Sequence, residues 1–148
     1  CMVVLRDLNF EYSKVEMVLS LKQKRISENF VSLYLTVTFK FGFGEISRDF
    51  VWTDEDVDAL AEQIESIPET PAFGSFATFE PEVSMFYFNP AVEFYDDLEE
   101  EFHLYINMDS GIFNKNISTD TGPSLKLVTN KKTLLQWIQE VQKEFLDK

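Results

Sequence analysis

The densest group of chemically active side chains is the segment "VEFYDDLEEEF" at residues 92–102. Paired carboxylates can act as a general acid and a general base, and carboxylate oxygens are also the preferred ligands of Ca²⁺. Next to this segment stands His103, the only histidine of the chain. Glu101 and His103 are two residues apart, so in a strand they would share a face and could form an acid–base pair.

The further residues that such chemistry needs are missing from the sequence. There is no second histidine, no glycine-rich phosphate loop and no pattern of an activated nucleophile. Neither acidic run, "DEDVD" at 54–58 nor "DDLEEE" at 96–101, follows the spacing of a calcium loop. Cys1 is the only cysteine, which excludes an intrachain disulfide and Cys–His zinc spacing. We therefore expect a protein that is not an enzyme and needs no metal or other cofactor.

The charges are segregated along the chain. Residues 49–114 contain seventeen acidic residues and no Lys or Arg, whereas the two flanks together carry all thirteen bases and nine acids. A surface of one sign disfavours nucleic acid and anionic membranes as partners and attracts a basic protein. The alternative is that an acidic surface serves solubility alone.

Alternating apolar residues predict a set of mainly antiparallel strands. The clearest is "VSLYLTVTFKF" at 31–41, which a glycine-flanked turn joins to 45–52 as a hairpin. Other strands are expected at 16–22, 83–88, 102–108 and 125–128, and a weaker one at 4–12. In the strand at 102–108, His103 falls on the face opposite Phe102 and Leu104.

Two amphipathic helices are expected. The first begins after Thr53, carries acidic residues in its first turn and ends at Pro68. The second begins after Asn130 and runs to the C-terminus. Aligning the two caps superimposes the apolar stripes, which is consistent with a β–β–α unit used twice. We prefer the simpler interpretation that any capped amphipathic helix after a strand has this pattern.

Two connecting segments differ in character. Residues 68–83 hold three of the five prolines together with Phe73, Phe76 and Phe79, and we expect a connector that these rings attach to the core. Residues 108–123 are polar and are the best candidate for a mobile loop. A chain of 148 residues with 45% hydrophobic residues should form one domain. We predict an α+β fold, a mainly antiparallel twisted sheet or small sandwich with two packed helices, in a cytoplasmic protein.

Three segments together resemble the WapI-type immunity proteins of bacterial polymorphic and contact-dependent toxins. They are "FVWTDEDVDALAEQI" at 50–64, "FEPEV" at 79–83 and "LLQWIQEVQKEF" at 134–145. The resemblance implies a small cytoplasmic protein that neutralises the toxic C-terminal domain of a cognate toxin. It implies no catalytic residues, and the loop at 108–123 departs from the pattern.

The acidic block and the resemblance together lead to one hypothesis. The chain binds and neutralises a basic, nuclease-like toxin domain through its acidic surface, without nucleic acid or membrane as partner. The alternative is an acidic nucleic-acid mimic or adaptor that binds basic proteins in general. Tyr95 is the expected aromatic anchor, because exposed aromatic residues ringed by polar groups are frequent interface hot spots. The predicted partner-binding residues are Asp54, Glu55, Asp58, Glu93, Tyr95, Asp96, Asp97, Glu99, Glu100 and Glu101.

Reversing the charge of the densest acidic run tests this hypothesis. Changing Asp96, Asp97, Glu99 and Glu100 to Lys should weaken binding of the basic partner and leave the fold intact, because the attraction would become repulsion. Calorimetric titration measures the affinity, and circular dichroism checks the fold. Unchanged affinity would rule out an electrostatic role for this run.

Overall fold

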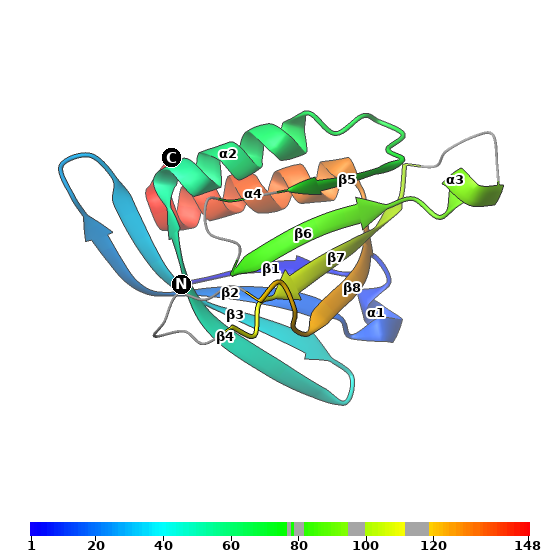
Figure 1. Cartoon of the computed structure of the whole chain (residues 1–148), viewed down its shortest axis with the longest axis horizontal. Helices are drawn as coiled ribbons and strands as arrows, with labels where there is room; N and C mark the ends of the chain where they lie inside the picture. Colours follow the sequence, from blue (N-terminus) through cyan, green and yellow to red (C-terminus); the bar gives the residue numbers. More distant parts are fainter. Residues whose placement is uncertain (77, 79–81, 95–99, 112–118) are drawn as a thin grey trace.

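The computed structural model describes residues 1–76, 78, 82–94, 100–111 and 119–148, with Glu93 and Phe94 as backbone only. It shows two four-stranded antiparallel sheets, which confirms the α+β class. The two long helices of the described chain lie side by side along one edge of the pair of sheets (Figure 1).

Sheet 1 is a simple meander formed by the N-terminal half of the chain. Its strands are β1 (Met2–Arg6), β2 (Glu16–Ile26), β3 (Val31–Phe41) and β4 (Gly44–Thr53), and each pairs with the next. The predicted hairpin is confirmed, with Phe41 opposite Gly44 across the turn. In β3 the odd-numbered residues Leu33, Leu35, Val37 and Phe39 are buried, as the alternation predicts.

Sheet 2 is a second meander, formed by β5 (Phe73–Phe76), β6 (Val83–Phe88), β7 (Phe102–Met108) and β8 (Ser124–Thr129). The single-turn helix α3 (Ala91–Phe94) lies between β6 and β7. The bounds predicted for β6 and β7 are confirmed, and β8 extends the predicted segment by one residue at each end. Met85, Leu104, Ile106 and Leu127 face the core.

A long helix follows each meander directly. Helix α2 (Asp54–Glu65) begins after Thr53, whose hydroxyl accepts from Asp56 N–H while the Asp56 carboxylate accepts from Thr53 N–H, a complete capping box. Helix α4 (Lys131–Leu146) begins after Asn130, whose side chain accepts from Thr133 N–H at 2.8 Å. Apart from the single-turn helices α1 and α3, each half consists of four strands followed by a long helix, so the β–β–α order of the repeated-unit interpretation occurs twice.

The helices complete a single hydrophobic core. Helix α2 contacts α4, β3, β4 and β5, and α4 contacts β1. Leu60 and Ile64 on α2 and Trp137 and Val141 on α4 are at most 2% exposed, and they belong to the same buried cluster as the inner faces of both sheets. The apolar stripes that the sequence predicts therefore close the core between the sheets.

Two sequence predictions are wrong in part. The strand expected at 4–12 ends at Arg6, and residues Phe10–Ser13 form the single-turn helix α1. The connector at 68–83 contains β5, whose alternation buries Phe76 but leaves Phe73 72% exposed, and Phe79 lies outside the described residues. Gly74 fits opposite Tyr87, because a Cβ there would lie 2.6 Å from the Tyr87 hydroxyl oxygen.

Two carboxylates join the sheets to each other. Asp7 is 7% exposed and accepts from Val128 N–H of β8 at 2.7 Å and from the Ser13 hydroxyl at 2.6 Å. On the other side, Glu82, just before β6, accepts from Val51 N–H of β4 at 3.2 Å. Each carboxylate satisfies an edge-strand N–H that would otherwise have no partner in the sheet.

Removing the Asp7 carboxylate should destabilise the fold. Asp7→Ala leaves the Val128 N–H without its acceptor in a buried site, and we expect a loss of about 1–3 kcal/mol in the free energy of unfolding. Urea unfolding measures the loss. Glu11→Ala, an exposed acidic residue of α1, is the control and should change stability by less than about 0.5 kcal/mol. Equal effects of the two substitutions would contradict the role of Asp7.

Candidate functional site

The structure describes only part of the predicted acidic surface. The side chains of Asp54, Glu55, Asp58, Glu100 and Glu101 are described, and Glu93 is described as backbone within α3. The remaining predicted residues, Tyr95, Asp96, Asp97 and Glu99, lie outside the described residues. Three of the five described side chains, Asp54, Glu55 and Asp58, lie on α2.

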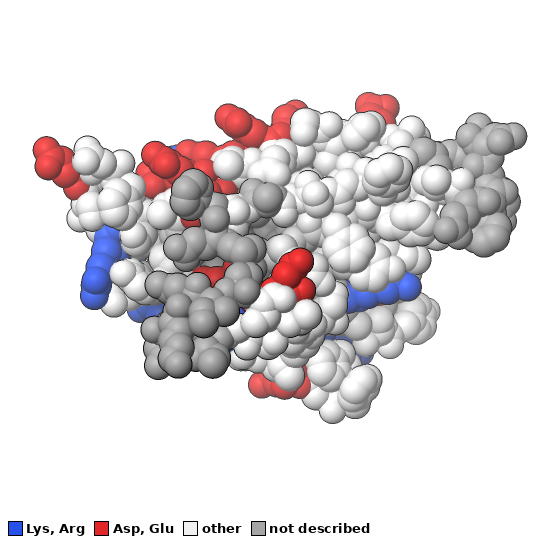
Figure 2. Space-filling model, in the orientation of Figure 1, with Lys and Arg blue, Asp and Glu red and all other residues white. Residues whose placement is uncertain are grey.

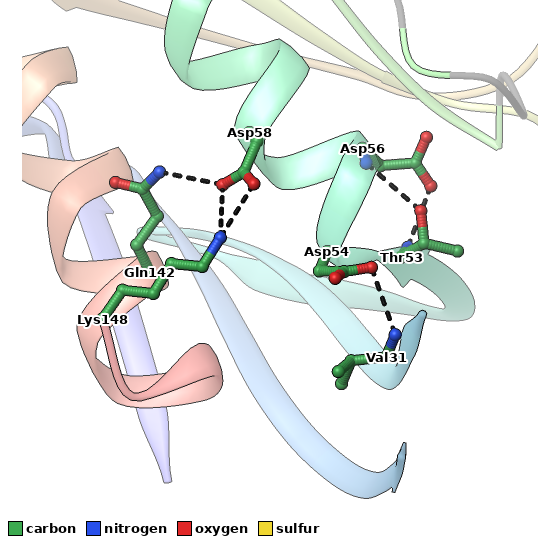
Figure 3. A network of polar contacts seen from close by, with 7 residues as sticks. All are labelled: Val31, Thr53, Asp54, Asp56, Asp58, Gln142 and Lys148. Atoms are coloured by element: carbon green, nitrogen blue, oxygen red, sulfur yellow. Dashed lines mark hydrogen bonds and ion pairs between the residues drawn. The ribbon is translucent and has the colours of Figure 1, made fainter. Parts of the chain in front are cut away.

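Two of the predicted acids on α2 have partners inside the molecule (Figure 3). The Asp54 Oδ1 atom accepts from Val31 N–H of β3 at 3.1 Å. The Asp58 carboxylate accepts from Gln142 at 3.2 Å and forms an ion pair with Lys148 at 2.8 Å, both from the C-terminal part of the chain. Asp54 and Asp58 thus attach α2 to β3 and to the end of α4, which gives them a structural role.

Four other acidic side chains, on α2 or just after it, make no such contacts within the described chain. Glu55, Glu62 and Glu65 are exposed, as is Glu69 beyond the end of the helix. Within the described part of the chain, none of these four side chains takes part in an ion pair or a hydrogen bond. We call them the α2 glutamates. Figure 2 shows acidic side chains along the edge of the molecule that α2 forms in Figure 1.

Three of the α2 glutamates are absent from the predicted site, although a signal for them exists. Glu55, Glu62 and Glu69 are seven residues apart, and Glu65 follows Glu62 by three, so residues 55, 62 and 65 fall on one side of a helix. The sequence prediction rests on the density of charge in 92–102 and not on this helical period. The helical period of the acids is the more informative pattern.

Asp49, the first acid of the acidic stretch at 49–114, is paired within the molecule. It accepts from the Thr36 hydroxyl at 2.6 Å and from Lys22 at 2.9 Å on the outer surface of sheet 1. These two hydrogen bonds lower the pKa of Asp49 below its usual value. Because its charge is paired, Asp49 contributes little to the field that a partner would meet.

His103 lies on the outer face of sheet 2, half-buried between Phe88 and Val128 of the neighbouring strands. Burial lowers the pKa of His103, and the nearby positive charge of Lys126 lowers it further. Glu101 is exposed and makes no hydrogen bond with His103. Among the described residues, no three His, Cys, Asp or Glu side chains are grouped so that they could hold a metal ion.

Comparison with known proteins adds no assignment. No protein-family model matches the chain, and no curated protein and no solved structure matches it either. Within the described residues, no helix combines the length and the apolar character needed to cross a membrane.

The pKa of His103 provides a test of its surroundings. Lys126→Gln should raise this pKa towards the usual value of 6.5, because it removes a repulsive charge, whereas Lys143→Gln on α4 should leave it unchanged. Proton NMR titration follows a single histidine without overlap. A pKa that does not respond to Lys126→Gln would contradict the proposed proximity of the two charges.

The same shift sets the sign of a pH effect on stability. Because the pKa in the folded state is lower than in the unfolded state, the contribution of neutral His103 is complete above pH 6.5 and is lost as the pH falls through the folded-state pKa. His103→Gln should therefore reduce the pH dependence of unfolding below pH 6.5. Urea unfolding at several pH values measures it, and an unchanged dependence would contradict this assignment.

Proposed function

We propose that this chain is a binding protein of the immunity type, which neutralises a basic bacterial toxin domain by covering its nucleic-acid-binding surface. The observation that carries the proposal is the row of α2 glutamates, which are exposed and without partners in the described chain. The resemblance of residues 50–64, 79–83 and 134–145 to WapI-type immunity proteins supports the class of function.

The α2 glutamates have the arrangement that electrostatic recognition requires. Helix α2 carries six acids and no basic residue, and one of these acids, Asp58, forms an ion pair with Lys148. Exposed charges of one sign within roughly 8–10 Å of each other add their fields at physiological ionic strength. A basic partner is therefore attracted over a distance and oriented before contact, which raises the association rate.

The helix that carries these charges is held firmly. Its N-terminus is capped by Thr53, Asp54 bonds to β3, Asp58 bonds to α4, and Leu60 and Ile64 are buried in the core. A charged face on a rigid element loses little conformational entropy when it binds. This supports a preformed docking surface.

Charge reversal on α2 tests the proposal. Glu62→Lys with Glu65→Lys replaces two exposed glutamates near the C-terminal end of α2, where positive charge complements the helix dipole, so the helix should remain stable. We expect the association rate with the partner at 50 mM salt to fall by about tenfold or more. Stopped-flow mixing or surface plasmon resonance measures it, with a basic protein domain that co-purifies with the unaltered chain as the partner.

The matched control changes the net charge by the same amount elsewhere. Glu11→Lys with Glu28→Lys reverses two exposed acids at α1 and at the β2–β3 turn. Equal slowing by both pairs would show that net charge alone acts, which contradicts a site on α2. Equally tight binding of polylysine to the unaltered protein would favour the general phosphate mimic over a cognate immunity protein.

A further inference from the structure

The outer face of sheet 2 has a composition unlike the rest of this acidic protein. Its aromatic residues are Phe73, Phe86, Phe88, Tyr105 and His103, and none of its described strand positions holds Asp or Glu. We call this surface the aromatic face. Buried residues alternate with it along β6, β7 and β8, so it is the solvent side of the sheet and lies outside the core.

At the centre of the aromatic face two rings are stacked. Phe86 and Tyr105 lie opposite each other on β6 and β7, with ring centroids 4.6 Å apart and planes 7° apart. Tyr105 covers one face of the Phe86 ring, and Phe86 is still 42% exposed. An ordered ring with one open face is suited to stack against a flat group of a ligand.

A cavity of about 800 Å³ opens beside this stack. Phe86 lines it together with polar groups from three strands, namely Ser75, Ser84 and Asn107. Its remaining polar side chains come from the loop after β7: Asp109, Asp120 and Thr121. Among the described lining residues there are two carboxylates and neither Lys nor Arg, so the cavity is charge-complementary to a cation.

The loop wall of the cavity is built on hydrogen bonds to the end of β7. Ser110 N–H donates to the Thr121 carbonyl at 2.7 Å, and the buried Asp109 carboxylate accepts from Thr119 N–H and from its hydroxyl, the latter at 2.7 Å. Gly122 passes so close to β7 that a Cβ there would lie 1.8 Å from the Met108 carbonyl oxygen. Asp120 is exposed within this wall.

We propose that this cavity binds the guanidinium group of an arginine side chain on a protein partner. The planar guanidinium stacks on the open face of Phe86 and donates hydrogen bonds to the Asp120 carboxylate and to the oxygen atoms of Ser84 and Asn107. Arginine fits better than lysine because its head is flat and presents five donors in a fixed geometry. The only lysine of the aromatic face, Lys126, lies beyond Tyr105, roughly 10 Å from Phe86 at the spacing of two strands.

The proposed function requires a basic protein as the partner, and an arginine side chain would come from such a protein. In this respect the inference rests on the proposed function. The site itself lies on sheet 2 and not on α2. The two proposals can therefore fail separately: charge reversal on α2 tests docking of the whole toxin domain, whereas a small arginine probe tests the cavity without any toxin.

The test uses the complete chain, labelled with ¹⁵N, and three blocked amino acids: N-acetyl-arginine methylamide, the lysine equivalent and the neutral citrulline equivalent. At 150 mM salt we expect the arginine compound to shift the amide signals of Phe86, Asn107 and Gly122, with a Kd of roughly 1–10 mM for so small a ligand. Phe86→Ala and Asp120→Asn should each weaken binding about tenfold. Phe43→Ala removes an exposed ring of the β3–β4 turn and should leave binding unchanged.

Several outcomes would overturn the proposal. Equal shifts of the amide signals with the lysine or citrulline compound would show that the site does not recognise a guanidinium. Amide shifts confined to α2 would show only a general attraction of the cation to the acidic helix. Tighter binding of a single-stranded oligonucleotide at the same residues would assign the face to nucleic acid instead. Amide shifts that change with protein concentration when no compound is added would assign the aromatic face to a second copy of the chain. Phe86 and Asp120 are both exposed, and thermal unfolding checks that their variants remain folded.

Discussion

The packing of α2 against α4 is the constraint on which the rest of the structure depends. Each four-stranded sheet has one buried apolar face, and the buried residues of both sheets form one cluster with the stripes of the two helices. The helices come directly after β4 and β8, so each enters the core from the last strand of its own sheet. Without their contact, apolar surface of both sheets would be exposed to water, which is unfavourable by roughly 25 cal/mol per Å².

The many acidic residues of this chain have two distinct uses. Asp7, Glu82 and Asp54 accept hydrogen bonds from backbone N–H groups at a strand edge or a strand start, where neutral partners are lacking. The α2 glutamates make no such bonds in the described chain and face the solvent. A carboxylate is a strong acceptor as well as a charge. The number of acids in a sequence therefore overstates the charge that a partner can reach.

The sequence analysis does not predict the aromatic face, and the pattern of β6 gives the reason. In "VSMFYF" both faces of β6 carry large apolar or aromatic residues, so the period of two does not say whether Met85 or Phe86 is buried. The contacts of Met85 with the core decide it, and Phe86 is left on the solvent side. Likewise, β5 has only four residues, one of which is a glycine, and prolines precede it in the sequence. It forms a strand because β6 provides a partner.

The sequence by itself determined the elements with strong local patterns: β3, β6, β7 and the starts of α2 and α4, because alternation, apolar stripes and capping residues act over a few neighbouring residues. It also determined that the middle of the chain is acidic. The tertiary structure alone decided which acids are bound within the molecule, as Asp58 is through Lys148, and which remain exposed, as Glu62 does. The reason is physical: such hydrogen bonds and ion pairs join residues far apart in the chain, so their partners exist only once the sheets and helices have packed.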